Sequence, residues 1–418
     1  MSRIKKIFAH EILSGIGIPT VEATVVLDSG SVGVASFPSG EGGIYDALEL
    51  RDRDQKRYGG HGVLRAVANV LSPIAPMLIG KDALDQQLID KKMIELDGTP
   101  HKSNLGANAI FSVSMAVAKA AAKHSNLPPY LYLRQFLNKG PKPSIPTPLF
   151  NLINGAIDPS TKLSDFSEFI IVPASSKRFE ESLEIANSIH NSLRSLLREK
   201  GFGEIDEYND ITTQKILSNR EALLLLKQSV EDISVRPGLD VFFGLNSRAG
   251  NFFKDGKYKI KDFPSSLSSE ELLDFYNELS KALNLLYIED PFSEDDWTAW
   301  QTISGAYSQK STIAGGDLTA TNLDRLQLAI SKKAINAIVI KPTQVGTVIE
   351  SLAIAGAAKA MGLKIIVSHR SNETTDDFIS DFAVAVASDY VKLGSLTRGE
   401  NVSKYNRLLQ IENQLKVL

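Results

Sequence analysis

Two neighbouring stretches decide the fold: Thr312-Ile313-Ala314-Gly315-Gly316-Asp317 and Ala337-Ile338-Val339-Ile340-Lys341. Each is a short apolar run that ends in polar or charged residues, and a longer amphipathic segment lies between them. Short apolar runs bounded in this way are typical of buried strands, and strands that alternate with helical segments predict a parallel sheet.

The same pattern extends over the second part of the chain. Long segments between most of the strands have helical spacing, as in residues 178–199, and Ser218…Glu221 and Ser268…Glu271 each predict a capping box that opens a helix. Eight strands with intervening helices predict a (β/α)₈-type barrel, although no helix is expected between the first two strands and two are expected between the second and third. The candidate strands are residues 149–153, 168–172, 241–246, 286–289, 312–315, 336–341, 365–369 and 390–392.

The first part of the chain has a different pattern. Residues 20–27 and 32–37 are rich in β-branched side chains and flank a turn, and helical patterns follow to about residue 137, including the Ala-rich stretch 107–123. Proline and glycine cluster between residues 140 and 148. We therefore expect an N-terminal α+β domain over residues 1–138 and a barrel over residues 139–418.

Composition excludes several classes of protein. The 418 residues contain 46 Lys+Arg and 49 Asp+Glu, a net charge of −3, so the basic excess of a nucleic-acid binder is missing. There is no cysteine, which rules out disulfides and thiolate chemistry, and the six histidines are scattered. No apolar run is long enough to cross a bilayer, and the basic start lacks the apolar stretch of a signal peptide. We expect a cytoplasmic protein that binds neither membranes nor nucleic acid.

Charged side chains follow the candidate strands, where a barrel carries its reactive residues. Lys341 and Lys392 each end an apolar strand, and a desolvated lysine there can act as a base. Arg370, Ser371 and Lys392 would form a clamp for phosphate or carboxylate. The plainer alternatives are a solvated turn for each polar group and salt bridges from these cations to Glu168, Glu289 and Asp290. The loop at Ser39 could bind a phosphate through its backbone N–H groups, and the plainer alternative is an ordinary surface turn. For His369 the plainer alternative to a role in the site is a buried, hydrogen-bonded side chain.

A series of motifs over essentially the whole chain resembles the enolase family, whose members are phosphopyruvate hydratases. They include Pro38-Ser39-Gly40, Leu96-Asp97-Gly98-Thr99, Gly106-Ala107-Asn108-Ala109-Ile110, Ile288-Glu289-Asp290-Pro291-Phe292, Ser368-His369-Arg370-Ser371 and Lys404-Tyr405-Asn406-Arg407. The resemblance implies the family fold, a small N-terminal α+β domain followed by a ββαα(βα)₆ barrel. That order of elements accounts for the irregular helix pattern.

The resemblance also implies roles for individual residues in converting 2-phosphoglycerate to phosphoenolpyruvate with two Mg²⁺ ions. Lys341 corresponds to the base that removes the C2 proton, and Glu168 to one of two acid-side glutamates. Glu289 corresponds to a metal ligand. The remaining matches are substrate ligands, with Ser39 at the lid position that reaches the second metal: Lys392, Arg370, Ser371, His369 and Ser39.

Several family positions are substituted. Asn246 and Gly316 stand where two further metal-binding aspartates are expected, and Asn209 stands at the position of the second catalytic glutamate. The substrate-loop histidine is missing from Ala156-Ile157-Asp158-Pro159, and the lid loop is one residue shorter and reads Glu41-Gly42-Gly43. Asp317 and Asp210 are adjacent candidates for replacement, but neighbouring strand residues point to opposite faces, so Asp317 would need a twist of the strand end.

These substitutions leave three hypotheses for function. The first is an enolase with weak or lost activity, because each lost charge-stabilising group costs about 10²–10³ in rate. The second is a non-catalytic protein that binds a phosphorylated carboxylate or a protein partner, and the third is a different lyase or isomerase reaction without the metal pair. Mg²⁺ is the cofactor implied by the resemblance, and the loss of carboxylates weakens its site. We expect a homodimer, weakened because His10 and Gln410 replace arginines of the family contact.

Overall fold

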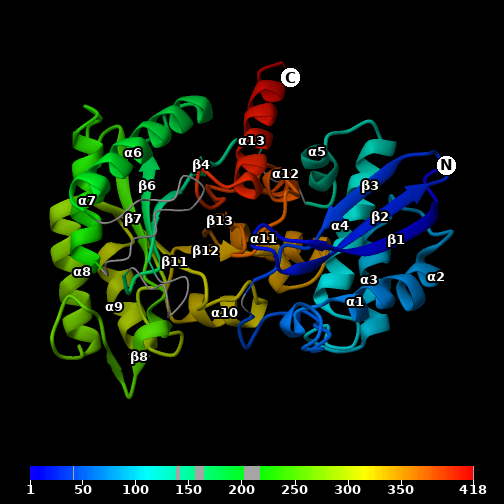
Figure 1. Ribbon diagram of the computed structural model, residues 1–418, viewed down its shortest axis with the longest axis horizontal. Helices are drawn as coiled ribbons and strands as arrows, with labels where there is room; N and C mark the ends of the chain where they lie inside the picture. Colours follow the sequence, from blue (N-terminus) through cyan, green and yellow to red (C-terminus); the bar gives the residue numbers. More distant parts are fainter. Residues whose placement is uncertain (41, 138–141, 156–163, 202–216, 418) are drawn as a thin grey trace.

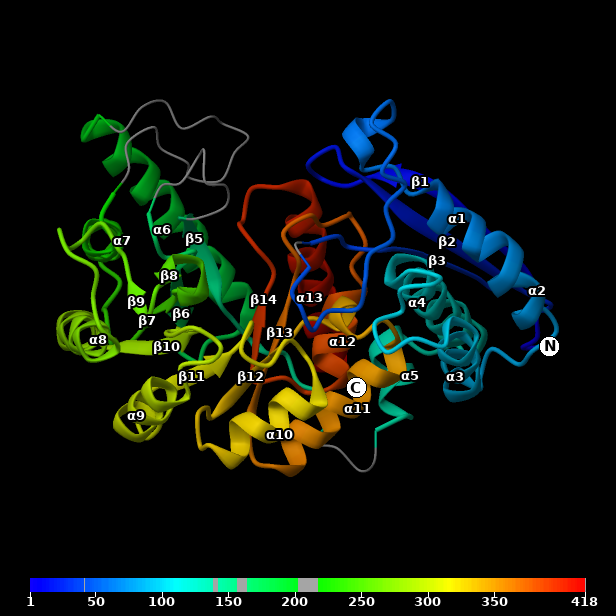
Figure 2. The same ribbon diagram turned by 90° about the horizontal axis from the view of Figure 1, so that it is seen from below.

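The computed structural model describes residues 1–40, 42–137, 142–155, 164–201 and 217–417. Figure 1 shows two parts side by side: a sheet with helices built from the first residues of the chain, and a larger barrel built from the rest. In the view turned by 90°, helices surround the barrel strands on the outside (Figure 2).

The N-terminal part is a three-stranded antiparallel sheet, in the order β1-β2-β3, covered by helices. Its strands are β1 (Ile4–Leu13), β2 (Pro19–Leu27) and β3 (Val32–Ser36), and its helices are α1 (Leu64–Asn69), α2 (Ala75–Leu78), α3 (Gln86–Asp97), α4 (Ala107–His124) and α5 (Pro129–Arg134). The small alanines of α4 let this helix lie close against β2 and β3, where Ala23 and Ala35 are fully buried. The predicted strands and the helix over 107–123 are confirmed.

The barrel contains all eight predicted strands. They are β4 (Thr147–Pro148) with β5 (Phe150–Asn154), β6 (Glu168–Pro173), β7 (Val241–Asn246), β10 (Leu285–Glu289), β11 (Thr312–Gly315), β12 (Ala337–Ile340), β13 (Lys364–Ser368) and β14 (Tyr390–Lys392). Their order is β4-β14-β13-β12-β11-β10-β7-β6-β5, and β4 and β5 are separated only by Leu149, so the chain closes the barrel at this strand. β6 runs antiparallel to both of its neighbours, and the other pairings are parallel.

The helices of the barrel follow the predicted irregular pattern, with two helices between β6 and β7. The capping boxes at Ser218 and Ser268 both form at helix starts. The helices are α6 (Phe179–Glu199), α7 (Asn219–Glu231), α8 (Ser269–Leu283), α9 (Trp297–Tyr307), α10 (Leu323–Ser331), α11 (Val348–Ala360), α12 (Phe378–Ala385) and α13 (Gly399–Val417), and a small hairpin of β8 (Phe253–Lys254) and β9 (Lys257–Tyr258) precedes α8. Within the described ranges, none of the helices is long and apolar enough to span a bilayer.

The barrel interior is a small apolar layer distinct from the main core. Alternate residues point to opposite faces of a strand, so one set of side chains fills the interior and the other packs against the helices. The interior set is Leu149, Ile170, Val172, Tyr287, Ala314, Ala337, Val339 and Ile366. This layer fills the barrel beneath its mouth, and the next inward-facing residue of each strand therefore lies at the mouth.

The N-terminal part completes a helix of the barrel. The Asp90 carboxylate on α3 accepts a hydrogen bond from the backbone N–H of Ile349 (3.0 Å), and the Ser114 hydroxyl on α4 accepts one from Val348 (3.1 Å). Both donors belong to the first turn of α11, whose N–H groups have no partner within the helix. The two parts of the chain are thus joined by backbone capping as well as by apolar packing.

Candidate active site

The side chains at the barrel mouth follow from strand alternation. On the parallel strands, each of these side chains lies two residues after a position at the level of the interior apolar layer. Strand β6 runs in the opposite direction, so there the side chain lies two residues before such a position. The register places Asn246 between Glu168 and Glu289 on neighbouring strands. The residues that reach the mouth in this way are Glu168, Asn246, Glu289, Gly316, Lys341, Ser368 and Lys392.

Lys392 forms the centre of this group. Its ammonium lies 2.5 Å from Oε2 of Glu168 and 2.7 Å from Oε2 of Glu289, and only 3% of its side chain is exposed. Burial opposes a charge here, but the two carboxylates outweigh it and hold the pKa of Lys392 above its ordinary value. Burial would likewise raise the pKa of Glu168, yet the ammonium, together with the Asn246 amide, lowers it. The salt bridges proposed as the plainer alternative for Lys392 are therefore present.

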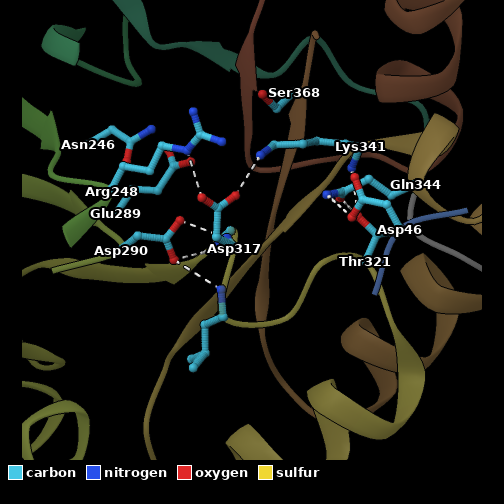
Figure 3. A network of polar contacts seen from close by, with 12 residues as sticks. Asp46, Asn246, Arg248, Glu289, Asp290, Asp317, Thr321, Lys341, Gln344 and Ser368 are labelled. Atoms are coloured by element: carbon cyan, nitrogen blue, oxygen red, sulfur yellow. Dashed lines mark hydrogen bonds and ion pairs between the residues drawn. The ribbon is translucent and has the colours of Figure 1, made fainter. Parts of the chain in front are cut away.

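Two buried oxygen atoms in this group have no hydrogen-bond partner. The Asn246 amide donates to Glu168 (2.8 Å), which turns its own Oδ1 away from that carboxylate, and Oδ1 is unpaired. Glu289 uses Oε2 for both Lys392 and the Tyr287 hydroxyl (2.5 Å), and its Oε1 is unpaired. Figure 3 shows Asn246 and Glu289 beside each other at one side of the site.

Asp317 occupies the other side of the mouth, next to Lys341. Its carboxylate lies 3.4 Å from the Lys341 ammonium and 2.7 Å from Nε of Arg248 (Figure 3). Burial would raise its pKa, but these two cations hold the pKa of Asp317 well below the usual range. Strand β11 ends at Gly315, so the alternation of side chains along the strand does not extend to Asp317. The turn after β11 brings the Asp317 carboxylate into the mouth.

Gly316 leaves a space between two carboxylates. A Cβ atom at this residue would lie 2.6 Å from Oδ2 of Asp290 and 2.9 Å from Oε1 of Glu289. Asp290 is held in place because its carboxylate accepts hydrogen bonds from the backbone N–H groups of Gly316 (2.9 Å) and Asp317 (2.7 Å). Burial and the nearby Asp317 and Glu289 charges raise the pKa of Asp290 to about 8.

Ser39 and Asp46, on either side of the lid loop, contact Arg370 and its neighbours. Ser39 and Asn372 form a two-way backbone bridge, with both N···O distances 3.0 Å, and the Arg370 guanidinium lies 3.4 Å from the buried Asp46 carboxylate. The Ser39 hydroxyl itself contacts Glu49 and accepts a hydrogen bond from Arg51 (2.6 Å). Ser39 therefore anchors the lid, and its hydroxyl is engaged within the N-terminal part.

A stack of side chains holds the segment that follows the lid loop. The Arg325 guanidinium lies 4.9 Å from the ring centroid of Tyr45 in this segment and 5.0 Å from that of Trp297 at the start of α9. Hydrogen bonds from Arg325 to the Leu318 and Glu294 carbonyl oxygens (both 2.9 Å) fix its position. Cation–π contacts of this kind contribute about 0.5–1 kcal/mol each at partly exposed sites.

The remaining predicted site residues are placed as follows. His369 lies beside Lys392, its Nδ1 is buried and unpaired, and burial lowers its pKa to about 3. Ser371 is exposed at the end of the same loop. Asn209, Asp210 and residues 156–159 lie outside the described residues.

Sequence reasoning missed three participants. Asp46 contacts Arg370, and Gln344 links the two parts of the chain by donating to Asp46 (3.0 Å). Arg248 contacts Asp317, and its backbone has a positive φ of 47°. Arg248 follows β7 by two residues, so reading slightly further beyond each strand would have found it.

Two cavities lie at the opposite end of the barrel. One, of about 680 Å³, is lined by residues at the starts of β7, β10 and β11, and the other, of about 360 Å³, by residues at the start of β4 and the end of β6. Conserved chemistry in such barrels belongs to the other end, and neither cavity contains the groups described above.

Two family models match the chain. Residues 4–133 match the enolase N-terminal domain, and residues 142–417 match the enolase C-terminal TIM barrel domain. The chain belongs to the enolase family. The enolase resemblance and its barrel order are thereby confirmed, whereas the roles of the individual site residues stay predictions.

The described donor set of this enolase-family site does not fit Mg²⁺. Of the three expected carboxylates, Glu289 remains, and one of its oxygens is bonded to Lys392 and Tyr287. Asn246 offers a neutral oxygen and Gly316 offers none. Among the described residues, no group of three or more histidines or carboxylates is arranged to hold a metal ion. Mg²⁺ needs near-octahedral oxygen ligands, mainly from carboxylates, so we derive no chemical step through a metal here.

Proposed function

We propose that this enolase-family protein binds a small phosphorylated carboxylate at the barrel mouth without holding a stable pair of Mg²⁺ ions. On this proposal, interconversion of 2-phosphoglycerate and phosphoenolpyruvate is weak or lost. The observation that carries it is the position of Lys392, whose ammonium is bonded to both Glu168 and Glu289. It supplies within the chain the positive charge that a metal would otherwise bring to these carboxylates.

The arrangement of the two predicted catalytic groups supports weak chemistry. Lys341, the expected base, forms an ion pair with Asp317, and Glu168, the expected acid-side group, accepts hydrogen bonds from Lys392 and Asn246. The nitrogen of Lys341 that would take the C2 proton lies 3.4 Å from the Asp317 carboxylate. Both groups are thus occupied by partners within the chain.

Anion binding is supported by the side chains that surround the lid. Lys341, Arg370 and Ser371 stand at the end of neighbouring strands β12 and β13. A phosphate or carboxylate can take the place of Asp317 beside Lys341 and of Asp46 beside Arg370. Each replacement substitutes one charge-assisted hydrogen bond for another.

Calorimetric titration tests the binding, and absorbance of the enol product tests the chemistry. We expect phosphoenolpyruvate to bind in the absence of divalent ions and Mg²⁺ to change that affinity little. Product formation from 2-phosphoglycerate should be slow in the native chain and should increase in the variant Asn209→Glu with Asn246→Asp and Gly316→Asp. Micromolar Mg²⁺ binding to the native chain in the presence of phosphoenolpyruvate would overturn the proposal.

Oligomeric state is a separate part of the proposal. Glu22 lies 3.3 Å from His10, and Glu400 lies 2.7 Å from Arg398, so both glutamates have partners in their own chain. We propose a homodimer that dissociates at higher concentration than enolases with the arginine pairs. Sedimentation equilibrium over a dilution series measures this directly.

A further inference from the structure

The larger of the two cavities lies at the end of the barrel opposite the mouth. It is enclosed by the ends of α8 and α9, which pack beside each other (Figure 2), and by the first residues of β10 and those just before β11. Its volume of about 680 Å³ falls within the range of about 300–1,000 Å³ that is typical of small-molecule sites. The buried residues Leu285 and Ser311 line its inner side. The larger cavity is therefore large enough for a ligand and is separate from the barrel mouth.

The pairing of β7 and β10 is irregular next to this cavity. Leu285 pairs with Phe243 and Tyr287 pairs with Gly244, so Leu286 is an extra residue with no partner on β7. Such a bulge bends its strand and interrupts the ladder, and bulges at the rims of barrels redirect side chains. Leu286 is half-buried and lines both cavities. The shape of the larger cavity is thus set by the backbone as well as by side chains.

Two lysines give the larger cavity a positive charge. Lys281 in the last turn of α8 and Lys310 just beyond α9 both line it and are exposed. Neither ammonium has a hydrogen-bond or ion-pair partner within the described residues, and no carboxylate is among the described side chains that line the cavity. The C-terminus of a helix carries about half a negative charge, so each lysine more than offsets the helix end beside it. The larger cavity therefore attracts anions.

Aromatic rings form another part of the lining. Phe242 on β7 and Tyr307 at the end of α9 are both half-buried, and both line the larger cavity. The Tyr307 hydroxyl donates a hydrogen bond to Oδ1 of Asn277 on α8, which fixes the position of the ring. Aromatic side chains pack favourably against other flat rings, in stacked or edge-to-face arrangements. The cavity thus offers cations for an anionic group and aromatic surface for a ring.

We propose that the larger cavity binds a phosphate monoester of a compound with a flat aromatic ring, of which a nucleoside monophosphate is the simplest example. The phosphate is held by Lys281 and Lys310, and the ring lies against Phe242 and Tyr307. A phosphate monoester carries a charge of about −1.5 to −2 at pH 7, which matches the two ammonium groups. Inorganic phosphate would leave the rings uncovered, and an uncharged ring compound would leave the lysines without an anion. The site does not depend on the function proposed for the barrel mouth.

Three compounds test the two halves of the site by calorimetry in metal-free buffer. Adenosine monophosphate (AMP) is the probe, and adenosine and inorganic phosphate each keep one half of it. We expect AMP to bind at least about tenfold more tightly than either, because only AMP makes both sets of contacts. The affinity for AMP should fall as the salt concentration rises, because salt screens exposed charges.

Substitutions at the surface locate the site without disturbing the core. Lys281→Gln and Lys310→Gln should each weaken AMP binding by about three- to fivefold, and the double variant by at least about tenfold. Ala306→Phe places a ring inside the cavity from an exposed position of α9, so it should abolish AMP binding. The matched control is Lys332→Gln, which removes an exposed lysine at the end of α10 that lines neither cavity and should keep the full affinity. Thermal melting checks that each variant is folded.

The outcomes separate this site from the barrel mouth. AMP binding that is lost in folded Ala306→Phe, is kept in Lys332→Gln and is unchanged by excess phosphoenolpyruvate supports the assignment. The inference is refuted if AMP does not bind, if inorganic phosphate binds as tightly, or if Ala306→Phe still binds AMP. It is also refuted if phosphoenolpyruvate displaces AMP, because AMP would then occupy the mouth. Failure of phosphoenolpyruvate to bind would contradict the proposed function alone.

Discussion

Replacing Lys392 by methionine tests the most consequential contact in the structure. The change keeps most of the side-chain volume and removes the ammonium that Glu168 and Glu289 share. Breaking a buried ion pair by removing one partner costs about 3–5 kcal/mol, because the remaining charge is left uncompensated. Here two carboxylates lose the same partner, so we expect the free energy of unfolding at pH 7 to fall by at least about 3 kcal/mol.

Urea denaturation at several pH values gives this loss a specific signature. In the native chain Lys392 lowers the pKa of Glu168, so its stabilising contribution is present above the ordinary glutamate value of 4.5 and is lost as the pH falls through the lower folded pKa. In Lys392→Met, burial is left to raise the pKa of Glu168. The folded variant then binds protons more readily than the unfolded chain, so the stability gap should narrow between pH 7 and pH 5.

Two further variants control the interpretation. Lys91→Met removes an exposed lysine whose ion pair with Glu95 is at the surface, and it should change stability by no more than about 0.5 kcal/mol. Adding Glu168→Gln and Glu289→Gln to Lys392→Met removes the stranded charges and should restore most of the loss. The reasoning would be refuted if Lys392→Met lowered the free energy of unfolding by less than about 1 kcal/mol. It would also be refuted if the difference in free energy of unfolding between the native chain and the variant did not depend on pH.

Three other expectations follow from single residues. His190 is buried on α6 and burial lowers its pKa to about 4, so the native chain should lose stability as the pH falls from 6.5 to 4, by up to about 1.4 kcal/mol per pH unit, and His190→Leu should remove that part of the slope in acid denaturation. Gly316→Asp alone should lower the melting temperature in metal-free buffer, because its Cβ atom would crowd two carboxylates, and Mg²⁺ should recover part of the loss in thermal-shift measurements. Tyr45→Ala should weaken the attachment of the segment after the lid loop by about 0.5–1 kcal/mol, and stopped-flow fluorescence of Trp297 should show faster ligand release with little change in folding stability.

The barrel was predictable because its signals are local. Runs such as Ala337–Ile340 are apolar, short and bounded by polar residues, so strands could be located without knowledge of their neighbours. Alternation along the same strands then put Lys341, Lys392, Glu168 and Glu289 at one mouth. What each strand contributes to the site therefore follows from the residue two places beyond its last buried interior position.

The partners of those side chains could not be read in the same way. Lys392 meets Glu168 across 224 positions of sequence, and the choice between a salt bridge and a free base depends on atomic distances. Strand alternation alone could not place Asp317, which needed a twist of the strand end: β11 ends two residues earlier, and the turn after it brings the carboxylate beside Lys341. The unpaired oxygens of Asn246 and Glu289 depend on how three neighbouring side chains share their hydrogen bonds, which no spacing reveals.

The capping of α11 by Asp90 and Ser114 limits how this chain can be divided or recombined. A barrel fragment produced without the first part would begin one of its own helices with two backbone donors stripped of their acceptors, and an N-terminal fragment would keep a buried carboxylate with one of its donors missing. Each piece would therefore lack partners for its own buried polar groups. If the N-terminal part is replaced by that of another protein, the new part must supply acceptors in the places of Asp90 and Ser114. Otherwise the first turn of α11, which stays with the barrel, loses both of these hydrogen bonds.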